Sequence, residues 1–279
     1  MTLTEMRRIL DGRGWQLTRS LGQNFLHDAN QVRRIVAAAG LVPGDRVLEI
    51  GPGLGPLTEG LVEASGRVLA VEKDARMVEA LRERMAGALA DGRLEVVHAD
   101  ALQWLRAGSW QGDGWKVASN LPYSVGSPIL VQLALAARGP SRMVVTLQEE
   151  VIDRLAARAG TEDYGVLTLL VGLRFRVQDA FRIPRDCFFP APDVESACAV
   201  LDRRGATGLE EGAVDAYVRL VKTGFGQRRK MLAKLAGAVW GRGPVEEAMR
   251  AAGVGVNDRA EVVTREQFVA MTARLARAG

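Results

Sequence analysis

Apolar residues recur along the chain in two patterns, and the change from one to the other divides the chain into two parts. Up to about residue 204, short apolar runs alternate with segments in which apolar residues recur every three or four positions. Short runs are typical of strands buried on both faces, and the longer period is typical of amphipathic helices. The predicted strands are 46–50, 67–72, 94–100, 116–119, 142–147 and 197–201. This alternation predicts an α/β fold with a parallel sheet covered by helices on both faces.

The pattern changes after 203–208, Arg-Arg-Gly-Ala-Thr-Gly, a stretch with the composition of a linker. Beyond it the apolar period is helical throughout, and helices are predicted at 209–223, 226–238, 244–252 and 264–278. We therefore expect a larger sheet domain at 1–204, which includes an N-terminal arm, and a smaller all-α domain at 209–279.

Glu49, Glu72, Asp100 and Asn120 stand at the carboxyl ends of four successive predicted strands. Open α/β sheets bind their ligands at this edge. Glu72 follows the glycine turn after the first strand by about the interval at which nucleotide-binding folds place the acid that binds ribose. We expect Glu72 to accept hydrogen bonds from both ribose hydroxyls of a nucleoside cofactor. Asp100, one strand further, is suitably placed to accept from the exocyclic amine of its adenine.

The glycine turn itself reads Glu-Ile-Gly-Pro-Gly-Leu-Gly over 49–55 and opens a helix near Pro56. Without a Cβ, Gly51, Gly53 and Gly55 can take positive φ and let a ligand approach the main chain. A dinucleotide fingerprint needs a further small residue where Pro56 stands, and no Lys-Ser/Thr pair follows as a P-loop requires. The Glu-x-Gly-x-Gly-x-Gly spacing instead resembles the S-adenosylmethionine site of methyltransferases.

Charge adds a second candidate surface. The 37 Lys and Arg exceed the 33 Asp and Glu by only four, so local clustering must indicate any polyanionic partner. Residues 219–234 contain no acid and six cations, which we call the basic cluster: Arg219, Lys222, Arg228, Arg229, Lys230 and Lys234. A cluster of one sign in a nearly neutral protein favours a nucleic-acid surface, centred on Arg228, Arg229 and Lys230.

Cysteine and histidine usage excludes other classes. The two cysteines, Cys187 and Cys198, and the two histidines, His27 and His98, are spread along the chain and match no metal-ligand spacing. We therefore expect neither a metal site nor a disulfide framework. The N-terminus lacks an apolar leader, and no stretch approaches the roughly 18 apolar residues of a membrane helix. These features predict a cytoplasmic protein that is neither secreted nor inserted in a membrane.

Residues 120–123, Asn-Leu-Pro-Tyr, form the most specific stretch of the chain. The exocyclic amine of adenine or cytosine is a poor nucleophile, because its lone pair is delocalised into the ring. Two acceptors aimed at the amine hydrogens, the Asn120 side-chain oxygen and the Leu121 carbonyl, favour a tetrahedral nitrogen with a free lone pair. Pro122 holds this geometry, and Tyr123 offers a ring on which the base can stack. Positioning of this kind can supply roughly 7–11 kcal/mol, so methyl transfer needs no strong base.

Several motifs then occur in an order that resembles one family over nearly the whole chain. They are the sequences of residues 21–26, 49–55, 72–74, 100–102, 120–123, 148–151, 188–197 and 227–230. Together they closely resemble the small-subunit ribosomal RNA adenine dimethyltransferases of the KsgA type. The resemblance implies a Rossmann-like S-adenosylmethionine-dependent methyltransferase sheet and a helical, partly basic RNA-binding domain.

The resemblance also implies an activity. Four methyl groups would pass from S-adenosylmethionine, which leaves as S-adenosylhomocysteine, to two adjacent adenosines in the 3′-terminal hairpin loop of the small-subunit (16S) RNA. The expected partner is that RNA within a pre-small-subunit particle, bound by a monomer. By the same resemblance the cofactor residues are Gln23, Asn24, Leu26, Glu49, Gly51, Gly53, Gly55, Glu72, Lys73, Asp100, Ala101 and Asn120, and the base residues are Asn120, Leu121, Pro122, Tyr123 and Phe188. We expect Phe188 to face the cleft opposite Tyr123 while Phe189 fills the core.

Some positions depart from the family pattern, and three alternatives follow from the residues. Ser20, Ser124, Asp193 and Lys234 replace more usual residues, and a carboxylate at Asp193 would repel phosphate. One alternative is a relative that methylates a single adenosine of large-subunit RNA, although Leu121 favours the small-subunit branch. A second is a non-enzymatic nucleic-acid-binding factor, against which Asn120, Tyr123 and Glu72 argue. The third, a nicotinamide oxidoreductase, is disfavoured by Pro56.

Overall fold

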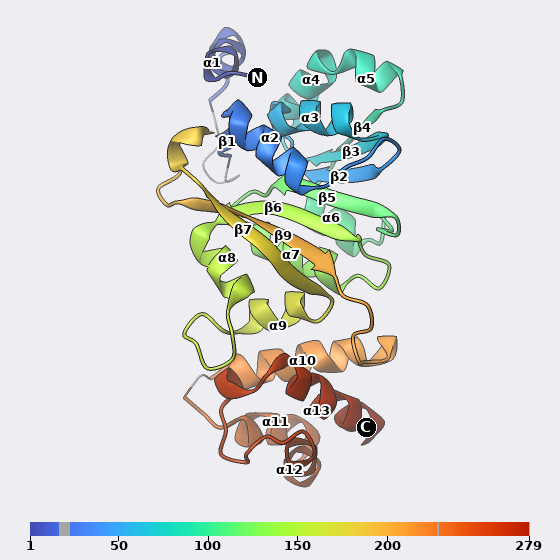
Figure 1. Ribbon diagram of the computed structural model, residues 1–279, viewed down its shortest axis with the longest axis vertical. Coiled ribbons are helices and arrows are strands. Elements are labelled where there is room, and N and C mark those ends of the chain that lie inside the picture. The colour runs from blue at the N-terminus through green and yellow to red at the C-terminus, as the bar shows by residue number, and fades with distance from the viewer. Residues whose placement is uncertain (17–22, 228, 279) are drawn as a thin grey trace. The chain divides into compact units, whose positions relative to one another are not determined.

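In the computed structural model, residues 1–16, 23–227 and 229–278 are described, and they form two compact units (Figure 1). The first unit contains Met1–Ile152 and Val177–Arg203, and the second contains Asp153–Arg176 and Arg204–Gly279. Each unit is therefore described by itself. None of the helices described is long and apolar enough to cross a membrane.

The first unit is built on a seven-stranded sheet with the order β4-β3-β2-β5-β6-β9-β7. The strands are β2 (Arg46–Ile50), β3 (Arg67–Glu72), β4 (Leu94–His98), β5 (Trp115–Asn120), β6 (Arg142–Gln148), β7 (Phe175–Ile183) and β9 (Ser196–Arg203). The five strands from β4 to β6 pair in parallel, and β9 runs antiparallel to β6. The predicted α/β fold with a parallel sheet is thus confirmed.

Helices precede and connect these strands, in keeping with the predicted alternation. They are α1 (Leu3–Gly12), α2 (Ala29–Ala38), α3 (Pro56–Ala64), α4 (Ala75–Arg84), α5 (Ala86–Ala90), α6 (Ala101–Arg106), α7 (Gly126–Leu135) and α8 (Glu149–Ala156). The Thr2 side chain and Glu5 form a capping box at the start of α1, and the Asp28 side chain caps α2. These caps satisfy backbone N–H groups that the first turn of a helix leaves unpaired.

The sheet reverses its strand order between β2 and β5, which makes their carboxyl ends the topological switch point. The two strands pair only from Arg46–Trp115 to Leu48–Val117. Beyond that point the Ile50 N–H donates to the buried Ser119 hydroxyl at 2.9 Å, in place of a main-chain acceptor on β5. The Ser119 side chain therefore lets the strands separate here without leaving a buried donor unpaired.

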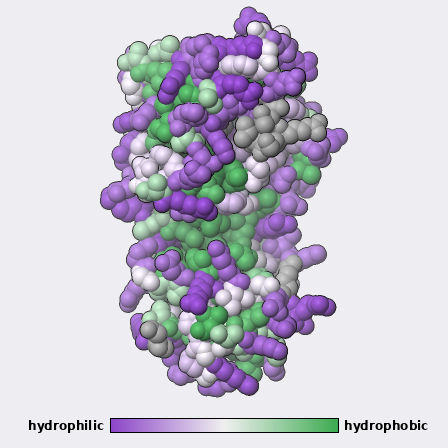
Figure 2. Space-filling view, turned by 180° about the vertical axis from the view of Figure 1, so that it is seen from behind, coloured by the Kyte–Doolittle hydropathy of each residue, from purple (hydrophilic) through white to green (hydrophobic). Residues whose placement is uncertain are grey.

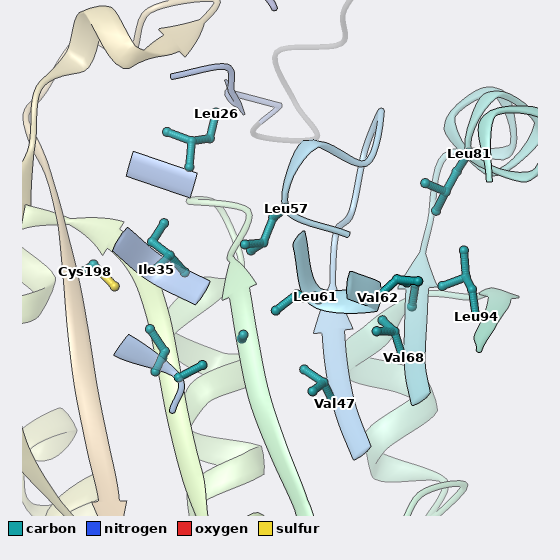
Figure 3. Packing of buried hydrophobic residues seen from close by; sticks show 14 of the residues in the cluster. Leu26, Ile35, Val47, Leu57, Leu61, Val62, Val68, Leu81, Leu94 and Cys198 are labelled. Atoms are coloured by element: carbon teal, nitrogen blue, oxygen red, sulfur yellow. The ribbon is translucent and has the colours of Figure 1, made fainter. Parts of the chain in front are cut away.

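Hydrophobic side chains from the sheet and its helices form the main core of the first unit (Figure 3). Val47 and Val68 from the sheet are fully buried, and Leu57 and Leu61 from α3 are buried beside them. Leu26 and Phe188 join this core through a small second sheet, in which β1 (Phe25–Leu26) runs antiparallel to β8 (Phe188–Phe189). The short strands β1 and β8 lie outside the six strands that the sequence predicts.

The second unit is helical and contains α9 (Val166–Gly172), α10 (Val214–Phe225), α11 (Leu232–Trp240), α12 (Arg242–Ala251) and α13 (Arg265–Ala278). The Tyr217 hydroxyl on α10 donates to the Leu169 carbonyl on α9 at 3.0 Å. Residues 153–176 therefore belong with the C-terminal helices, whereas the sequence boundary assigned them to the sheet domain. The helix predicted at 226–238 begins later, at Leu232.

Hydrophilic residues cover much of the face shown in Figure 2, and hydrophobic residues reach the surface in patches between them. Large hydrophobic residues with more than a third of their area exposed include Val125 and Val194 of the first unit and Met231 of the second. Only Val125 among these three lines the cavity described next.

Candidate cofactor and base site

A cavity opens at the switch point, and its walls come from the carboxyl ends of β2, β3, β4 and β5 and from the segment before β1. We call it the switch-point cavity. Ten of the predicted site residues line it: Gln23, Asn24, Gly51, Glu72, Lys73, Asp100, Ala101, Asn120, Leu121 and Pro122. Residues far apart in the sequence thus meet at the edge where the sequence placed them.

Glu72, at the end of β3, is only 8% exposed and is held by main-chain donors. One carboxylate oxygen accepts from the N–H groups of Lys73 and Asp74, each at 2.8 Å, and the other accepts from Gly53 at 3.1 Å. Burial raises the pKa of Glu72, and the three main-chain N–H groups oppose this rise. A carboxylate has about four acceptor positions, so Oε2 retains room for a further donor such as a ribose hydroxyl. Main-chain N–H groups thus fix the orientation of the Glu72 carboxylate and connect it to the glycine turn.

Glu49 lies one strand away but is buried beneath the turn, and it does not line the switch-point cavity. Its carboxyl accepts from the Thr58 hydroxyl of α3 at 2.7 Å. Burial raises its pKa from an ordinary 4.5 to about 8, because an isolated charge is costly where water is excluded. The prediction that Glu49 contacts a cofactor is therefore wrong for this structure. Glu49 supports the turn from below.

This environment makes unfolding depend on pH. Between about pH 4.5 and 8 the folded chain keeps the Glu49 proton and the unfolded chain releases it, so stability falls as the pH rises. The loss is about 1.4 kcal/mol per pH unit over this interval. We expect Glu49→Gln to remove this contribution, so that the wild type loses about 2–3 kcal/mol more than the variant between roughly pH 5.5 and 7.5. Urea unfolding at the two pH values measures it, and parallel pH dependences would contradict the assignment.

Of the three glycines in the turn, Gly51 lines the cavity and the two others do not. Gly51 lines the cavity with φ +69°, and a Cβ there would approach the Pro122 ring at 3.2 Å. Gly53 and Gly55 do not line it. A Cβ on Gly53 would lie 2.4 Å from the Phe25 ring, and one on Gly55 would lie 2.5 Å from Leu81. These two glycines are therefore required by packing around the turn, which the spacing alone did not reveal.

Asp100 and Lys73 form one wall of the cavity. The Asp100 carboxylate caps α6 by accepting from the Gln103 N–H at 3.1 Å and pairs with the Lys73 ammonium at 2.9 Å. The Lys73 partner, followed by the Gln103 N–H, lowers the pKa of Asp100, which stays ionised. Asp100 is thus a fixed acceptor beside Ala101, as binding of an adenine amine requires.

Asn120 has the most informative geometry in the site. Its side-chain nitrogen donates to the Asn24 carbonyl at 2.8 Å, which turns its oxygen the other way. That oxygen, Oδ1, is buried and has no hydrogen-bond partner among the described residues. A buried acceptor without a donor is costly, so its native partner is expected to come from a ligand. Leu121 and Pro122 continue the cavity wall beside it.

The two predicted stacking rings lie elsewhere. Tyr123 is half-buried and is not part of the cavity lining, although Pro122 and Ser124 on either side of it are. Phe188 is 3% exposed within the main core. Phe189 is half-buried against the cluster around Met6 and Leu10. The expectation that Phe188 faces the cleft while Phe189 fills the core is therefore wrong for this structure.

Two further predictions concern the N-terminal segment. Gln23 lines the cavity and donates to the Asp74 carboxylate at 3.0 Å, but Leu26 is buried in the main core and does not touch the cavity. Leu26 is opposite Phe188 in the β1–β8 pair, which explains its burial. Ser20, Leu21 and Gly22 lie outside the described residues. The sequence assigned no role to Ser119, which adjoins Asn120, or to Asp74, although Asp74 lies in the motif at 72–74.

In the second unit, Arg229 and Lys230 are exposed on the turn that precedes α11, and Lys222 and Lys234 are exposed nearby in the sequence. None of these four forms an ion pair with the residues that the structure describes. Arg219 instead lies over the Trp240 ring at 5.3 Å, and Arg228 falls outside the described residues. Within the described ranges no group of three or more His, Cys, Asp or Glu side chains could hold a metal ion.

Comparisons with known proteins found similar chains over nearly the whole sequence. Residues 14–277 match the ribosomal RNA adenine dimethylase family. The chain is 38% identical to ribosomal RNA small subunit methyltransferase A of Pelotomaculum thermopropionicum, with 95% of this chain and 94% of that protein covered. It is 39% identical to the protein of that name from Nocardia farcinica, with 97% and 94% covered.

Two solved structures are also similar. The 23S rRNA methyltransferase ErmE is 30% identical with a TM-score of 0.64, and 91% of this chain and 100% of that chain are covered. A dimethyladenosine transferase from Plasmodium falciparum is 22% identical with a TM-score of 0.72, and 91% and 98% are covered. The second match is evidence for the shared fold alone.

Proposed function

The chain belongs to the ribosomal RNA adenine dimethylase family, and from that premise we propose that it dimethylates two adjacent adenosines in the 3′-terminal hairpin loop of small-subunit RNA. The methyl groups would come from S-adenosylmethionine, four for each RNA. The chain is thus an RNA adenine dimethyltransferase, and the proposal concerns its substrate, its cofactor and the roles of its residues.

The orientation of Asn120 carries the proposal. An amide that donates to a main-chain carbonyl on one side and leaves a buried oxygen unpaired on the other can receive the hydrogens of an exocyclic amine. Together with the Leu121 carbonyl it would hold the amine nitrogen tetrahedral, so that its lone pair faces the methyl donor. The proton becomes acidic once the nitrogen has been methylated, and no side chain has to remove it first. Binding and orientation therefore account for the role of these residues.

The cofactor would occupy the rest of the switch-point cavity. S-adenosylmethionine supplies an electrophilic sulfonium methyl group. Glu72 would accept from its ribose, Asp100 with Ala101 would hold its adenine, and Gly51 with Gln23 and Asn24 would border its methionine end. The fit rests on the open acceptor position of Glu72 and on the positive φ of Gly51, which keeps that side of the cavity free of a side chain.

The proposal is tested with purified protein, labelled S-adenosylmethionine and small ribosomal subunits from a strain that lacks the modification. We expect dimethyladenosine at two neighbouring positions of the small-subunit RNA. Naked large-subunit RNA serves as the competing substrate, because the similarity to the 23S rRNA methyltransferase ErmE makes large-subunit RNA the alternative substrate. Methylation of large-subunit RNA alone would contradict the proposed substrate.

We further propose that the basic cluster binds RNA phosphates. Replacing Arg228, Arg229 and Lys230 with glutamine is expected to weaken RNA binding and flatten its salt dependence. Each lost phosphate contact lowers the slope of log affinity against log salt by about 0.7–0.9. Arg67→Gln, Arg93→Gln and Arg138→Gln together form a matched control, because these exposed arginines are paired with Glu95, Asp91 and Asp113. Equal slopes for the two sets of variants would place the RNA surface elsewhere.

A pre-small-subunit particle is the proposed partner, as the family resemblance implies. We propose that the protein acts there as a cytoplasmic monomer. Sedimentation of the protein with assembling small subunits, and its mass in solution, test these two points separately.

A further inference from the structure

Tyr123 is anchored by a contact that none of the motif roles above includes. Its hydroxyl forms a hydrogen bond with the hydroxyl of Ser196, the first residue of β9. Ser196 is fully buried, whereas Tyr123 is half-buried. The phenol hydroxyl is thus held by a buried partner, and Tyr123 stands in the sequence between Pro122 and Ser124, which line the cavity.

The anchor is rigid because of where Ser196 lies. Its partner across the ladder is Gln148, at the last position of β6, and the neighbouring Glu195 carbonyl accepts from the Glu149 N–H at 3.0 Å. Ser196 is therefore fixed by the sheet on the side of β6 that is remote from β5. Burial raises the pKa of Tyr123, so the phenol stays neutral and keeps its hydrogen.

We propose that Ser196 is a positioning residue that fixes the ring of Tyr123 for the target adenine, and that the second methyl transfer depends on it more than the first. This inference rests on the proposed function together with the stacking role that the sequence predicts for Tyr123, whose neighbours Pro122 and Ser124 line the cavity although Tyr123 itself does not. A free tyrosine side chain samples several rotamers, and the bond to a buried hydroxyl restricts it to one. The ring then presents the same face to the base in each round of transfer.

The second transfer is the more demanding one. After the first methyl transfer, the amine carries one methyl group and one hydrogen. For the second transfer the base must therefore bind with that hydrogen toward the Asn120 oxygen and with the methyl group away from it. If the Tyr123 ring is not held in place, the base can shift with it and adopts this orientation less often. Loss of the anchor should therefore raise the share of monomethyladenosine among the products.

The experiment compares Ser196→Ala, Tyr123→Phe and the double variant, each of which keeps the aromatic ring. We expect each single variant to lower kcat/KM for the RNA by about 2- to 12-fold, as loss of one neutral hydrogen bond does. We expect the double variant to be no worse than either single one, because both remove the same bond. The ratio of monomethyl to dimethyl product should rise in all three, while the Kd for S-adenosylmethionine stays within about twofold of wild type.

Two controls separate the possible failures. Ser65→Ala removes another buried serine hydroxyl, which donates to the Leu61 carbonyl at 2.7 Å and does not line the cavity, and it should leave the product ratio unchanged. Tyr123→Ala tests the proposed stacking itself and should reduce activity much further than Tyr123→Phe. If Tyr123→Ala is as active as wild type, the stacking role fails. If it is inactive while Ser196→Ala and Tyr123→Phe keep the wild-type product ratio, the anchoring role alone is overturned. Additive losses in the double variant would also overturn it.

Discussion

Replacing Asn120 with alanine is expected to lower the rate of methyl transfer by about 10²- to 10³-fold, the effect of removing one preorganised polar group at a reacting centre. The Asn120 oxygen is the buried acceptor without a partner, and its role is proposed for the target amine. Single-turnover rates with saturating S-adenosylmethionine and RNA measure this effect directly. A rate near wild type would show that the motif is only structural.

A second measurement decides which ligand Asn120 meets. Since its oxygen is assigned to the base, the Kd for S-adenosylmethionine should stay within a few fold of wild type in the alanine variant. A large loss of cofactor affinity would assign the residue to the cofactor instead. Asn120→Asp keeps one acceptor oxygen but replaces the amide donor to the Asn24 carbonyl with a second oxygen, so an activity lower than wild type would show that the tether itself matters.

Glu72→Ala is expected to weaken both the protein and its cofactor binding. The sequence alone predicts only the second effect, since it presents Glu72 as a ribose ligand. In the structure the carboxylate also satisfies three main-chain N–H groups, of Gly53, Lys73 and Asp74. Each that stays buried and unpaired costs about 1–3 kcal/mol. Urea unfolding and calorimetric titration with S-adenosylmethionine measure the two effects.

Glu72→Gln separates these effects, because the amide keeps one acceptor oxygen and a similar shape. We expect this variant to recover much of the stability but still to bind S-adenosylmethionine about 10- to 100-fold more weakly, as loss of a hydrogen bond to a charged group does. Glu95→Gln on the neighbouring strand is the control, since Glu95 is exposed and forms an ion pair with Arg67. Wild-type affinity in Glu72→Gln would remove Glu72 from the cofactor site.

The parts of the site that the sequence predicted depend on local rules. Apolar runs identify the strands, and polar residues at their ends identify the ligand edge, because parallel strands bring those ends together. Glu72, Asp100 and Asn120 follow from this reasoning and meet at one cavity.

The parts that it missed depend on partners far away in the chain. Successive residues of a strand face opposite sides, so Phe188 and Phe189 must differ, but which one enters the core is decided by the pairing with Phe25 and Leu26. Glu49 ends its strand like the others, yet α3 covers it with Thr58. The Ser196 anchor likewise joins segments 73 residues apart, and no local pattern indicates it.

The division of the first unit into two stretches of sequence has a consequence for synthesis on the ribosome. Its sheet requires β9, which follows the insertion of Asp153–Arg176, and β1 has to wait for β8 more than 160 residues later. A nascent chain that ends at Ile152 carries the glycine turn and the Asn-Leu-Pro-Tyr segment. However, it exposes the whole edge of β6 and leaves Phe25 and Leu26 uncovered. Such an intermediate is prone to aggregate, because unpaired strand edges and apolar side chains are open at once. A truncated gene that appears to keep the catalytic half should therefore yield insoluble protein, and the enzyme becomes competent only after residue 203 has left the ribosome.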